Sequence, residues 1–315
     1  MIVTLTPNPS VDRTVEVTAL VRGAVLRATS AHVDPGGKGV NVARALAANG
    51  VKTTAVLPSG GPEGAQLAAL LEPEGIALAC MPIRGAVRAN ISVVEPDGTV
   101  TKINEPGPEL SAAEVAALVA ATLDTARAGA DWVVCSGSLP PGVSHRLYAD
   151  LLPALHDIAV RVAVDSSGPA LATALAAGPD LVKPNREELA EAAGHPVRTL
   201  GDAADAAAVL RASGAGTVLA SLGADGAVLV DHTGAYHGEA SIDEPRGAVG
   251  AGDAMLAGFL AAGAQGRTAL AEALAWGAAA ASLPGSRMPG PADLRRSAVH
   301  IHPHLEQDRV LRERS

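Results

Sequence analysis

Residues 162–193 read VAVDSSGPALATALAAGPDLVKPNREELAEAA, and they hold two short apolar runs separated by a helical pattern. Residues 162–164 predict a buried strand, and a polar turn at 165–168 separates it from an alanine-rich helix that reaches about residue 177. Residues 181–182 predict the next strand, and Asn185 can cap a helix over residues 186–193. A strand, a helix and a second strand in this order are typical of parallel strands with a helix packed on the sheet.

The same alternation continues on both sides of this stretch. The further elements we expect are a helix between a Ser111–Glu114 capping box and Gly129, a strand at 132–135, a helix at 202–213, a strand at 217–220 and its hairpin partner at 227–230. We therefore predict an α/β fold with a mainly parallel central sheet and helices on both faces. No linker rich in proline, glycine and serine divides the chain, so residues 1–315 are expected to form one domain.

Two segments, at about residues 11–34 and 85–105, break this rhythm. They alternate apolar and polar residues with a period of two, as Ile91 and Val93 do before a turn at residues 96–98. This pattern predicts a small, half-exposed sheet that stands off the main one. Such a sheet would either cover a site as a lid or pair with a second copy of the chain, and we expect a homodimer formed through it.

Composition narrows the possible partners. The chain has 315 residues, a formal net charge of −9 and only 2% aromatic residues, which disfavours binding to nucleic acid. The most apolar stretch, around residues 274–283, is shorter than the ~20 residues that span a bilayer. Cys80 and Cys135 lack metal-ligand spacing and are expected to be free thiols. With no signal-peptide pattern at the N-terminus, we expect a cytoplasmic protein that binds no membrane.

The segment 248–258 carries the first chemical signal. Its glycines precede an apolar helix, where small residues let backbone N–H groups approach an anion closely. Asp253 falls in the first turn of this helix, where a carboxylate could accept a proton from an attacking hydroxyl. The alternative is that Asp253 only caps the helix. The pattern is not a Walker A loop, because no G-x-x-x-x-G-K-[ST] motif occurs in the chain.

A second glycine-rich loop, at residues 34–41, also precedes a helix, which Gly50 is expected to end. Its three glycines allow a close backbone approach, and Lys38 and Asn41 suit a phosphorylated or polyhydroxylated ligand. The alternative is an ordinary turn with a solvated lysine.

Taken together, these loops resemble the motifs of the PfkB-type (ribokinase-like) sugar kinases. The matching segments are, in order, residues 35–43, 136–142, 165–168, 183–189, 221–227 and 249–253. Residues 4–12 and 101–108 are most similar to the phosphosugar branch of that family. The resemblance implies a ribokinase-like three-layer domain with a small β-sheet lid. It also implies ATP and Mg²⁺ as cofactors and a small phosphosugar as substrate.

The resemblance further implies a role for individual residues. Asp253 would be the catalytic base, beside a phosphoryl-binding nest formed by the N–H groups of Gly250, Ala251 and Gly252. The residues implied in substrate binding are Asp12, Gly37, Asn41 and Ser138 for the sugar, and Lys38, Arg88 and Lys102 for its phosphate. The residues implied near the nucleotide are Lys183, Asn185, Ser221, Gly223, Gly277 and Ala281, with Glu188 meeting Mg²⁺ through water. Without the resemblance, a solvated strand face would be the preferred interpretation of Arg88 and Lys102, and an exposed helix carboxylate would be nearly as good an interpretation of Glu188.

The reaction implied is phosphorylation of fructose 1-phosphate at its 6-hydroxyl to give fructose 1,6-bisphosphate. Tagatose 6-phosphate and fructose 6-phosphate are the alternative substrates, and a catalytically silent sugar-phosphate sensor is the non-enzymatic alternative. The chain departs from the family at Ala248, where relatives often carry a hydroxyl, and at the unusual residues 243–247. The role of His300, His302 and His304 stays open between a metal site and a polar edge strand.

Overall fold

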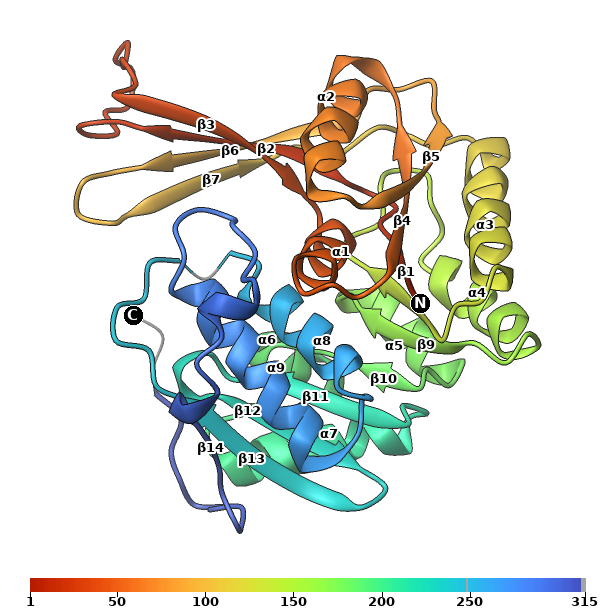
Figure 1. The fold of residues 1–315 in the computed structure, drawn as a ribbon, viewed down its shortest axis with the longest axis vertical. Coiled ribbons are helices and arrows are strands. Elements are labelled where there is room, and N and C mark those ends of the chain that lie inside the picture. The colour runs from red at the N-terminus through yellow and green to blue at the C-terminus, as the bar shows by residue number, and fades with distance from the viewer. Residues whose placement is uncertain (248, 313–315) are drawn as a thin grey trace.

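The computed structural model describes residues 1–247 and 249–312, which form one sheet of ten strands and a separate sheet of four (Figure 1). The strands of the large sheet are β1 (Ile2–Leu5), β4 (Thr53–Ser59), β5 (Ala77–Pro82), β8 (Trp132–Ser136), β9 (Arg161–Asp165), β10 (Leu181–Val182), β11 (Thr217–Ser221), β12 (Ala227–Asp231), β13 (Gly234–Ala240) and β14 (Val299–Ile301). The α-helices are α1 (Lys38–Ala48), α2 (Gly61–Leu71), α3 (Ala112–Arg127), α4 (Leu147–His156), α5 (Gly168–Ala176), α6 (Arg186–Ala193), α7 (Leu200–Ala212), α8 (Ala251–Ala261) and α9 (Gly266–Ala281).

The large sheet confirms the predicted α/β architecture. Its strand order is β14-β13-β12-β11-β10-β9-β8-β1-β4-β5, and the pairs from β11 to β5 are all parallel. The β11–β12 hairpin turns the chain, so that β12, β13 and β14 form an antiparallel edge. Because helices cover both faces of the sheet, the inner strands β1, β8, β9, β10 and β11 are largely buried and mostly apolar, whereas the edge strand β5 is only half-buried.

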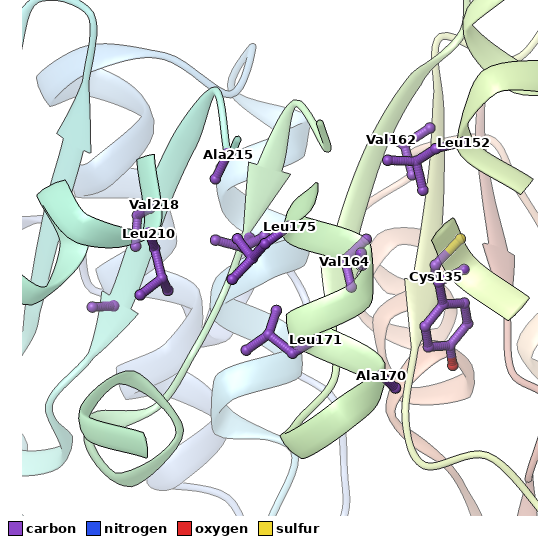
Figure 2. Close-up of a cluster of buried hydrophobic side chains, with 14 of the residues drawn as sticks. Cys135, Leu152, Val162, Val164, Ala170, Leu171, Leu175, Leu210, Ala215 and Val218 are labelled. Carbon is purple, nitrogen blue, oxygen red and sulfur yellow. The ribbon is translucent and has the colours of Figure 1, made fainter. Parts of the chain in front are cut away.

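Two apolar layers cover this sheet. Helices α3 to α7 supply the buried cluster on one face, part of which Figure 2 shows with Leu171 and Leu175 of α5 and Val164 of β9. Helices α1, α8 and α9 supply the cluster on the other face, which includes Phe259 and Trp276. Alanines let α8 and α9 pack closely, as expected for a core with few aromatic residues. None of the helices in the described ranges is long and apolar enough to cross a membrane.

Local signals place most element ends where the sequence predicts them. The Ser111–Glu114 capping box is present, and Gly50 and Gly129 follow the ends of α1 and α3 with positive φ. One start differs, because α7 begins at Leu200, two residues before the predicted start. Thr199 accepts a hydrogen bond from the Asp202 N–H and so caps the helix earlier.

The four-stranded sheet, which we call the lid, confirms the two predicted β segments. Its strands are β2 (Ser10–Glu16), β3 (Ser30–Gly36), β6 (Arg88–Val94) and β7 (Val100–Asn104), in the order β3-β2-β6-β7. It projects away from the large sheet as a twisted ribbon (Figure 1). Strand pairing sets Asp12 beside Asn90 and Asn90 beside Asn104, whereas Ile91 pairs with Ile103. The lid therefore has one polar face and one apolar face.

The C-terminal histidines lie along the β14 edge. His302 stacks on His237 with ring centroids 4.8 Å apart, and its Nε2 lies 3.1 Å from Glu239 Oε1. His300 packs edge-on against His302. In the residues that the structure describes, no cluster of His, Cys, Asp and Glu side chains has an arrangement that could hold a metal ion.

Candidate active site

The site lies where α1, α6 and α8 begin, beside the carboxyl ends of β9 and β10. Gly250 precedes α8 in the left-handed region, with φ 76°, a conformation that favours glycine. The first N–H groups of any α-helix have no acceptor within the helix, and in α8 no side chain caps them. A helix start of this kind is able to bind an anion, which is the role that the glycine-rich pattern predicts for it. Ala248, the departure from the family pattern, lies outside the described residues.

Asp253 does not cap this helix. It stands in the first turn of α8, and its Oδ2 accepts a hydrogen bond of 2.9 Å from Asn41 Nδ2 on α1. Its exposed fraction is only 7%. Burial, followed by the negative charge of Asp165, raises the pKa of Asp253 to about 6, although Lys183, Asn41 and Lys38 partly oppose this shift. Asp253 is thus a buried carboxylate with an unusually high affinity for a proton.

Asp165 is the second buried carboxylate of the site, and it lies between two lysines. Lys38 Nζ is 2.8 Å from Asp165 Oδ1, and Lys183 Nζ is 3.2 Å from Asp165 Oδ2. Burial alone would raise the pKa of Asp165, but Lys183 and Lys38 more than offset it and hold that pKa below the ordinary value. The two carboxylates, Asp165 and Asp253, are therefore shifted in opposite directions.

Lys38 is not a solvated lysine. Besides Asp165, its ammonium group lies 3.3 Å from Glu188 Oε1. Burial lowers the pKa of Lys38, but the carboxylates of Asp165 and Glu188 outweigh burial and raise it above the ordinary value. Lys183 is the other cation, only 4% exposed, and its Nζ lies 3.4 Å from the position a Cβ would take at Gly252. Both ammonium groups thus stand close to the start of α8.

Asn185 and Glu188 form a capping box at the start of α6. Asn185 Oδ1 accepts hydrogen bonds from the N–H groups of Glu187 and Glu188, and Glu188 Oε2 accepts one of 2.9 Å from the Asn185 N–H. Glu188 is therefore fixed by its own helix on one oxygen and faces Lys38 with the other. This arrangement excludes the alternative of a solvated surface carboxylate for Glu188.

The polar face of the lid brings Asp12 and Arg88 together at its base. Asp12 Oδ1 accepts hydrogen bonds from Ser10 Oγ and Asn90 Nδ2, and a Cβ at Gly36 would lie 2.5 Å from Asp12 Cγ. Arg88 donates to the carbonyl oxygens of Glu105 and Asn8, so it is not a freely solvated side chain.

Lys102 lies on the same face of the lid but pairs with Ser92, four residues beyond Arg88. Its backbone therefore stands about 13 Å further along the lid, at ~3.3 Å for each residue. Lys102 is exposed, and none of the described residues forms an ion pair with it. The structure thus separates two cations that the sequence grouped around one phosphate.

Loops at the carboxyl ends of β1 and β8 complete the part of the site at the base of the lid. Gly37, with φ 112°, is the N-cap of α1, and a Cβ there would lie 2.8 Å from Thr6 Cγ2. Ser138 accepts a hydrogen bond of 3.2 Å from Asn8 Nδ2, which also donates to the Pro106 carbonyl. Asn8 therefore joins the Ser138 loop to the base of the lid.

A cavity of about 450 Å³ lies between α9 and the unusual segment at residues 243–247. Its apolar wall is made by Ala275, Ala278 and Ala279. Gly277 and Ala281 are not among its lining residues, because they lie on a different face of α9. A Cβ at Gly277 would lie 3.3 Å from the Ala251 carbonyl oxygen, so this glycine serves the packing of α9 against α8.

Ser221 and Gly223 lie together at the end of β11. Ser221 pairs with Asn185 in an isolated bridge and donates its N–H to the Pro184 carbonyl. Gly223 begins the 3₁₀ turn Gly223–Asp225, with φ 64° and nothing within 4 Å of an added Cβ. The predicted nucleotide residues around β10 and β11 are therefore adjacent.

Two residues of the site were missed as functional side chains in the sequence. Asp165 belongs to a polar turn and to a segment that matches the family, but no role is predicted for it from the sequence, although it directly follows the apolar core of β9. A polar residue at the carboxyl end of a buried parallel strand is a signal that could have found it. Asn8 had no such signal, because its contacts lie 98 and 130 residues away in the chain.

Replacing Asp253 by asparagine should stabilise the fold near neutral pH. The pKa of about 6 exceeds the ordinary 3.8, so the native state binds more protons than the unfolded state between about pH 4 and 6. Wild-type stability therefore falls as the pH rises through this window. We expect Asp253→Asn to gain roughly 1–3 kcal/mol in the free energy of unfolding at about pH 7.5, and little below about pH 4, in urea titrations.

Asp165→Asn is the matched control and should change stability in the opposite direction. The pKa of Asp165 is lowered by its lysines, so removing its charge leaves Lys183 buried without a counter-ion. If Asp253→Asn instead lowers the free energy of unfolding at about pH 7.5, burial does not destabilise the charged form of Asp253.

Known proteins are similar to this chain in both sequence and fold. The family model described as "pfkB family carbohydrate kinase" matches residues 5–287. The 1-phosphofructokinase of Rhodobacter capsulatus is 41% identical over 84% of each chain. The 1-phosphofructokinase of Haloferax volcanii is 40% identical over 96% of this chain and 97% of its own.

The crystal structure of phosphofructokinase-2 from Escherichia coli in complex with potassium superposes with a TM-score of 0.85. It is 33% identical to this chain and covers 93% of it, with 96% of the crystallised chain aligned. The match of the family model extends across nearly all of the elements that build the site, from β1 to the loop after α9. The chain therefore belongs to the pfkB family of carbohydrate kinases and is an ATP-dependent kinase that acts on a sugar hydroxyl.

Proposed function

We propose that this kinase transfers the γ-phosphoryl group of ATP to the 6-hydroxyl of fructose 1-phosphate, giving fructose 1,6-bisphosphate. The observation that carries this proposal is Asp253, a buried carboxylate held by Asn41 directly beside the uncapped start of α8. A base and an anion-binding helix end in contact suit the transfer of a phosphoryl group to a hydroxyl. The names of the relatives, 1-phosphofructokinases at 41% and 40% identity, favour the choice of sugar.

Asp253 is the proposed general base. Its pKa of about 6 leaves it ionised at neutral pH, yet makes it a better proton acceptor than an ordinary aspartate. Asn41 donates to one carboxylate oxygen and so directs the other toward the substrate hydroxyl. The lysines near Asp165 keep the second carboxylate ionised, so the two acids do not compete for one role.

The donor phosphates are proposed to lie at the start of α8. The N–H groups of Gly250, Ala251 and Gly252 would stabilise charge on the transferring group, with Lys183 beside them. We also propose that Lys38 serves this phosphoryl group, because its ammonium lies between Asp165 and Glu188. This differs from the expectation that Lys38 binds the phosphate of the sugar.

Asp165 and Glu188 fit a site for Mg²⁺ that keeps most of its waters. Both supply carboxylate oxygens, and Asp165 Oδ2, which lies 3.2 Å from Lys183 Nζ, accepts no hydrogen bond from the other described residues. Bound Mg²⁺ would neutralise charge on the nucleotide phosphates. Asp165 and Glu188 would hold it, in line with the expectation that Glu188 acts through water.

The nucleoside of ATP is proposed to occupy the cavity beside α9. Three alanines of α9 line one side of this cavity and suit a purine ring, and Ser221, Gly223 and Asn185 would lie toward the ribose and phosphates. Gly277 would then act indirectly, by setting how close α9 lies to α8, and Ala281 by accepting hydrogen bonds from the N–H groups of Arg246 and Gly247.

The sugar is proposed to bind between Asp253 and the polar face of the lid. Asp12, Asn41, Ser138 and the backbone of Gly37 offer acceptors and donors of fixed direction for its hydroxyls. Arg88 is the proposed partner of the sugar phosphate, because a guanidinium can bind it through two parallel hydrogen bonds. Lys102 stays a further predicted partner, from its more distant position on the lid.

The apolar face of the lid supports our proposal of a homodimer. Ile91 and Ile103, paired across β6 and β7, are 36% and 56% exposed. The lid of a second copy could pack on these side chains, and it could also cover the unpaired edges of this small sheet. We place the enzyme in the cytoplasm, because both of its cysteines are free thiols.

Asp253→Asn should lower kcat by roughly 10²–10⁴-fold, the range expected for loss of a general base. The measurement is steady-state kinetics in an ATP-coupled assay, with KM for each substrate determined separately. Asp231→Asn, a buried aspartate at the far end of the β12 hairpin, is the control and should keep the wild-type kcat. An unchanged kcat in Asp253→Asn would contradict its role as the base.

Fructose 1-phosphate should give the highest kcat/KM when it is compared with fructose 6-phosphate and tagatose 6-phosphate. Arg88→Met should raise the KM for the phosphosugar by at least about tenfold and leave the KM for ATP within about twofold, because it removes a charge-assisted contact to one substrate only. A higher kcat/KM for fructose 6-phosphate would reassign the enzyme as a 6-phosphofructokinase. Phosphosugar binding without any turnover would support a sensor.

Ile103→Lys should convert the dimer to a monomer, because it places a charge on the exposed apolar face of the lid. Sedimentation velocity gives the mass of both forms. Val209→Lys, on the exposed side of α7 and away from the lid, should leave the dimer intact. A wild-type protein that sediments only as a monomer would refute the proposal.

A further inference from the structure

The C-terminal residues 305–312, which we call the strap, run beside the loop between α6 and α7. The Leu200 N–H donates to the Arg309 carbonyl, and the Leu311 N–H donates to the Arg198 carbonyl. Thr199 and Val310 form an antiparallel bridge. The strap is therefore docked by backbone hydrogen bonds, although it belongs to no sheet and its sequence matches none of the motifs described above.

The strap also binds the turn that follows β11. Asp225, in the Gly223–Asp225 turn, is only 2% exposed. Its Oδ2 accepts a hydrogen bond of 2.8 Å from the Arg312 N–H, and its Oδ1 lies 3.6 Å from Arg309 Nη2 and from Arg312 Nε. A buried carboxylate in this turn thus has its charge partners on the strap, about 80 residues away in the chain.

A second contact joins the strap to the start of α6. Arg186, which follows the N-cap Asn185, donates from Nη1 to the Arg312 carbonyl at 2.8 Å. The apolar side chain of Leu311 is 3% exposed and belongs to the same buried cluster as Leu189 of α6 and Leu222, which precedes Gly223. One short segment therefore contacts both elements that carry the nucleotide residues.

Arg309 fixes the outer side of the strap. Its Nη2 lies 2.7 Å from Glu239 Oε2 on β13. The other oxygen of this carboxylate, Oε1, lies 3.1 Å from His302 Nε2. His237 Nε2 lies 2.9 Å from the Asp225 carbonyl oxygen on the opposite side of the turn. The histidines near the β14 edge are therefore part of the support of this turn.

We propose that the strap positions the turn after β11 and the start of α6 relative to each other, with Asp225 as the positioning residue for binding of the donor nucleotide. This inference rests on the proposed function, which puts the nucleotide between these two elements. Neither Asp225 nor the strap touches the sugar side of the site. Loosening the strap should therefore weaken binding of the nucleotide and leave binding of the sugar phosphate unchanged.

The test compares Asp225→Ala with Asp231→Ala in the full-length protein. Both aspartates are 2% exposed and lie at opposite ends of the β12 hairpin. Asp231 accepts hydrogen bonds from the N–H groups of Thr233 and Gly266, so its loss removes a comparable set of contacts away from the site. The readouts are KM for ATP, KM for fructose 1-phosphate, kcat, the melting temperature, and calorimetric Kd for a non-hydrolysable ATP analogue.

Asp225→Ala should raise both the KM for ATP and the Kd of the analogue by roughly tenfold, as expected for the loss of one or two charge-assisted hydrogen bonds. The KM for fructose 1-phosphate should stay within about twofold, and Asp231→Ala should lower the melting temperature without changing the Kd. Asp225→Asn keeps an oxygen for the Arg312 N–H and should recover most of the affinity. If Asp225→Ala does not fold, Arg309→Met, which removes the guanidinium that lies between Asp225 and Glu239, supplies the test and should raise the Kd of the analogue in the same direction.

A melting temperature lowered in both variants with an unchanged Kd for the analogue would overturn the inference, because the strap would then only stabilise the fold. Equal losses of affinity for the nucleotide and for the sugar phosphate would overturn it too. The proposed function fails by a different result, which is a wild-type protein that binds no ATP analogue or phosphorylates none of the phosphosugars.

Discussion

The buried charge of Asp165 is the constraint on which the site depends. A carboxylate with no exposed surface is costly unless cations reach it, and here Lys38 and Lys183 both do. Lys38 begins α1 and Lys183 follows β10, so their attraction to one carboxylate brings the two halves of the chain together at the edge of the sheet. Glu188 extends the same contact to α6. The residues that balance this charge are also those proposed to meet the nucleotide phosphates.

The same charges explain why we propose different roles for two similar acids. Asp253 has a raised pKa because it is buried, faces Asp165 and has an amide rather than a cation as its direct partner. Asp165 has a lowered pKa because two ammonium groups contact it. A carboxylate that holds a proton more readily suits transfer of that proton, whereas one that stays ionised suits cations. Each role follows from the neighbours of the carboxylate and not from its residue type.

Helix α1 carries most of the connections across the site. Lys38 and Asn41 contact the carboxylates, and one turn later Arg44, only 5% exposed, binds Glu74 and the Ser286 carbonyl. Asn49, at its C-cap, donates to the Pro289 carbonyl. The loop held in this way places Met288 against Gly250, where a Cβ would lie 2.5 Å from Met288 Cε. The conformation of the turn proposed to bind the phosphoryl group thus depends on packing from a helix some two hundred residues earlier.

The sequence by itself determined the alternation of strands and helices, the lid strands, the caps at Ser111 and Asn185 and the glycine-rich turns, because each depends on residues only a few positions apart. It also placed Asp253 and Asn41 in one site through their motifs. Only the tertiary structure decided that Lys38 faces Asp165 and Glu188, that Lys102 stands far from Arg88, and that Gly277 packs on α8. These outcomes depend on side chains up to 150 residues apart, as for Lys38 and Glu188, and local periodicity carries no information about such distances.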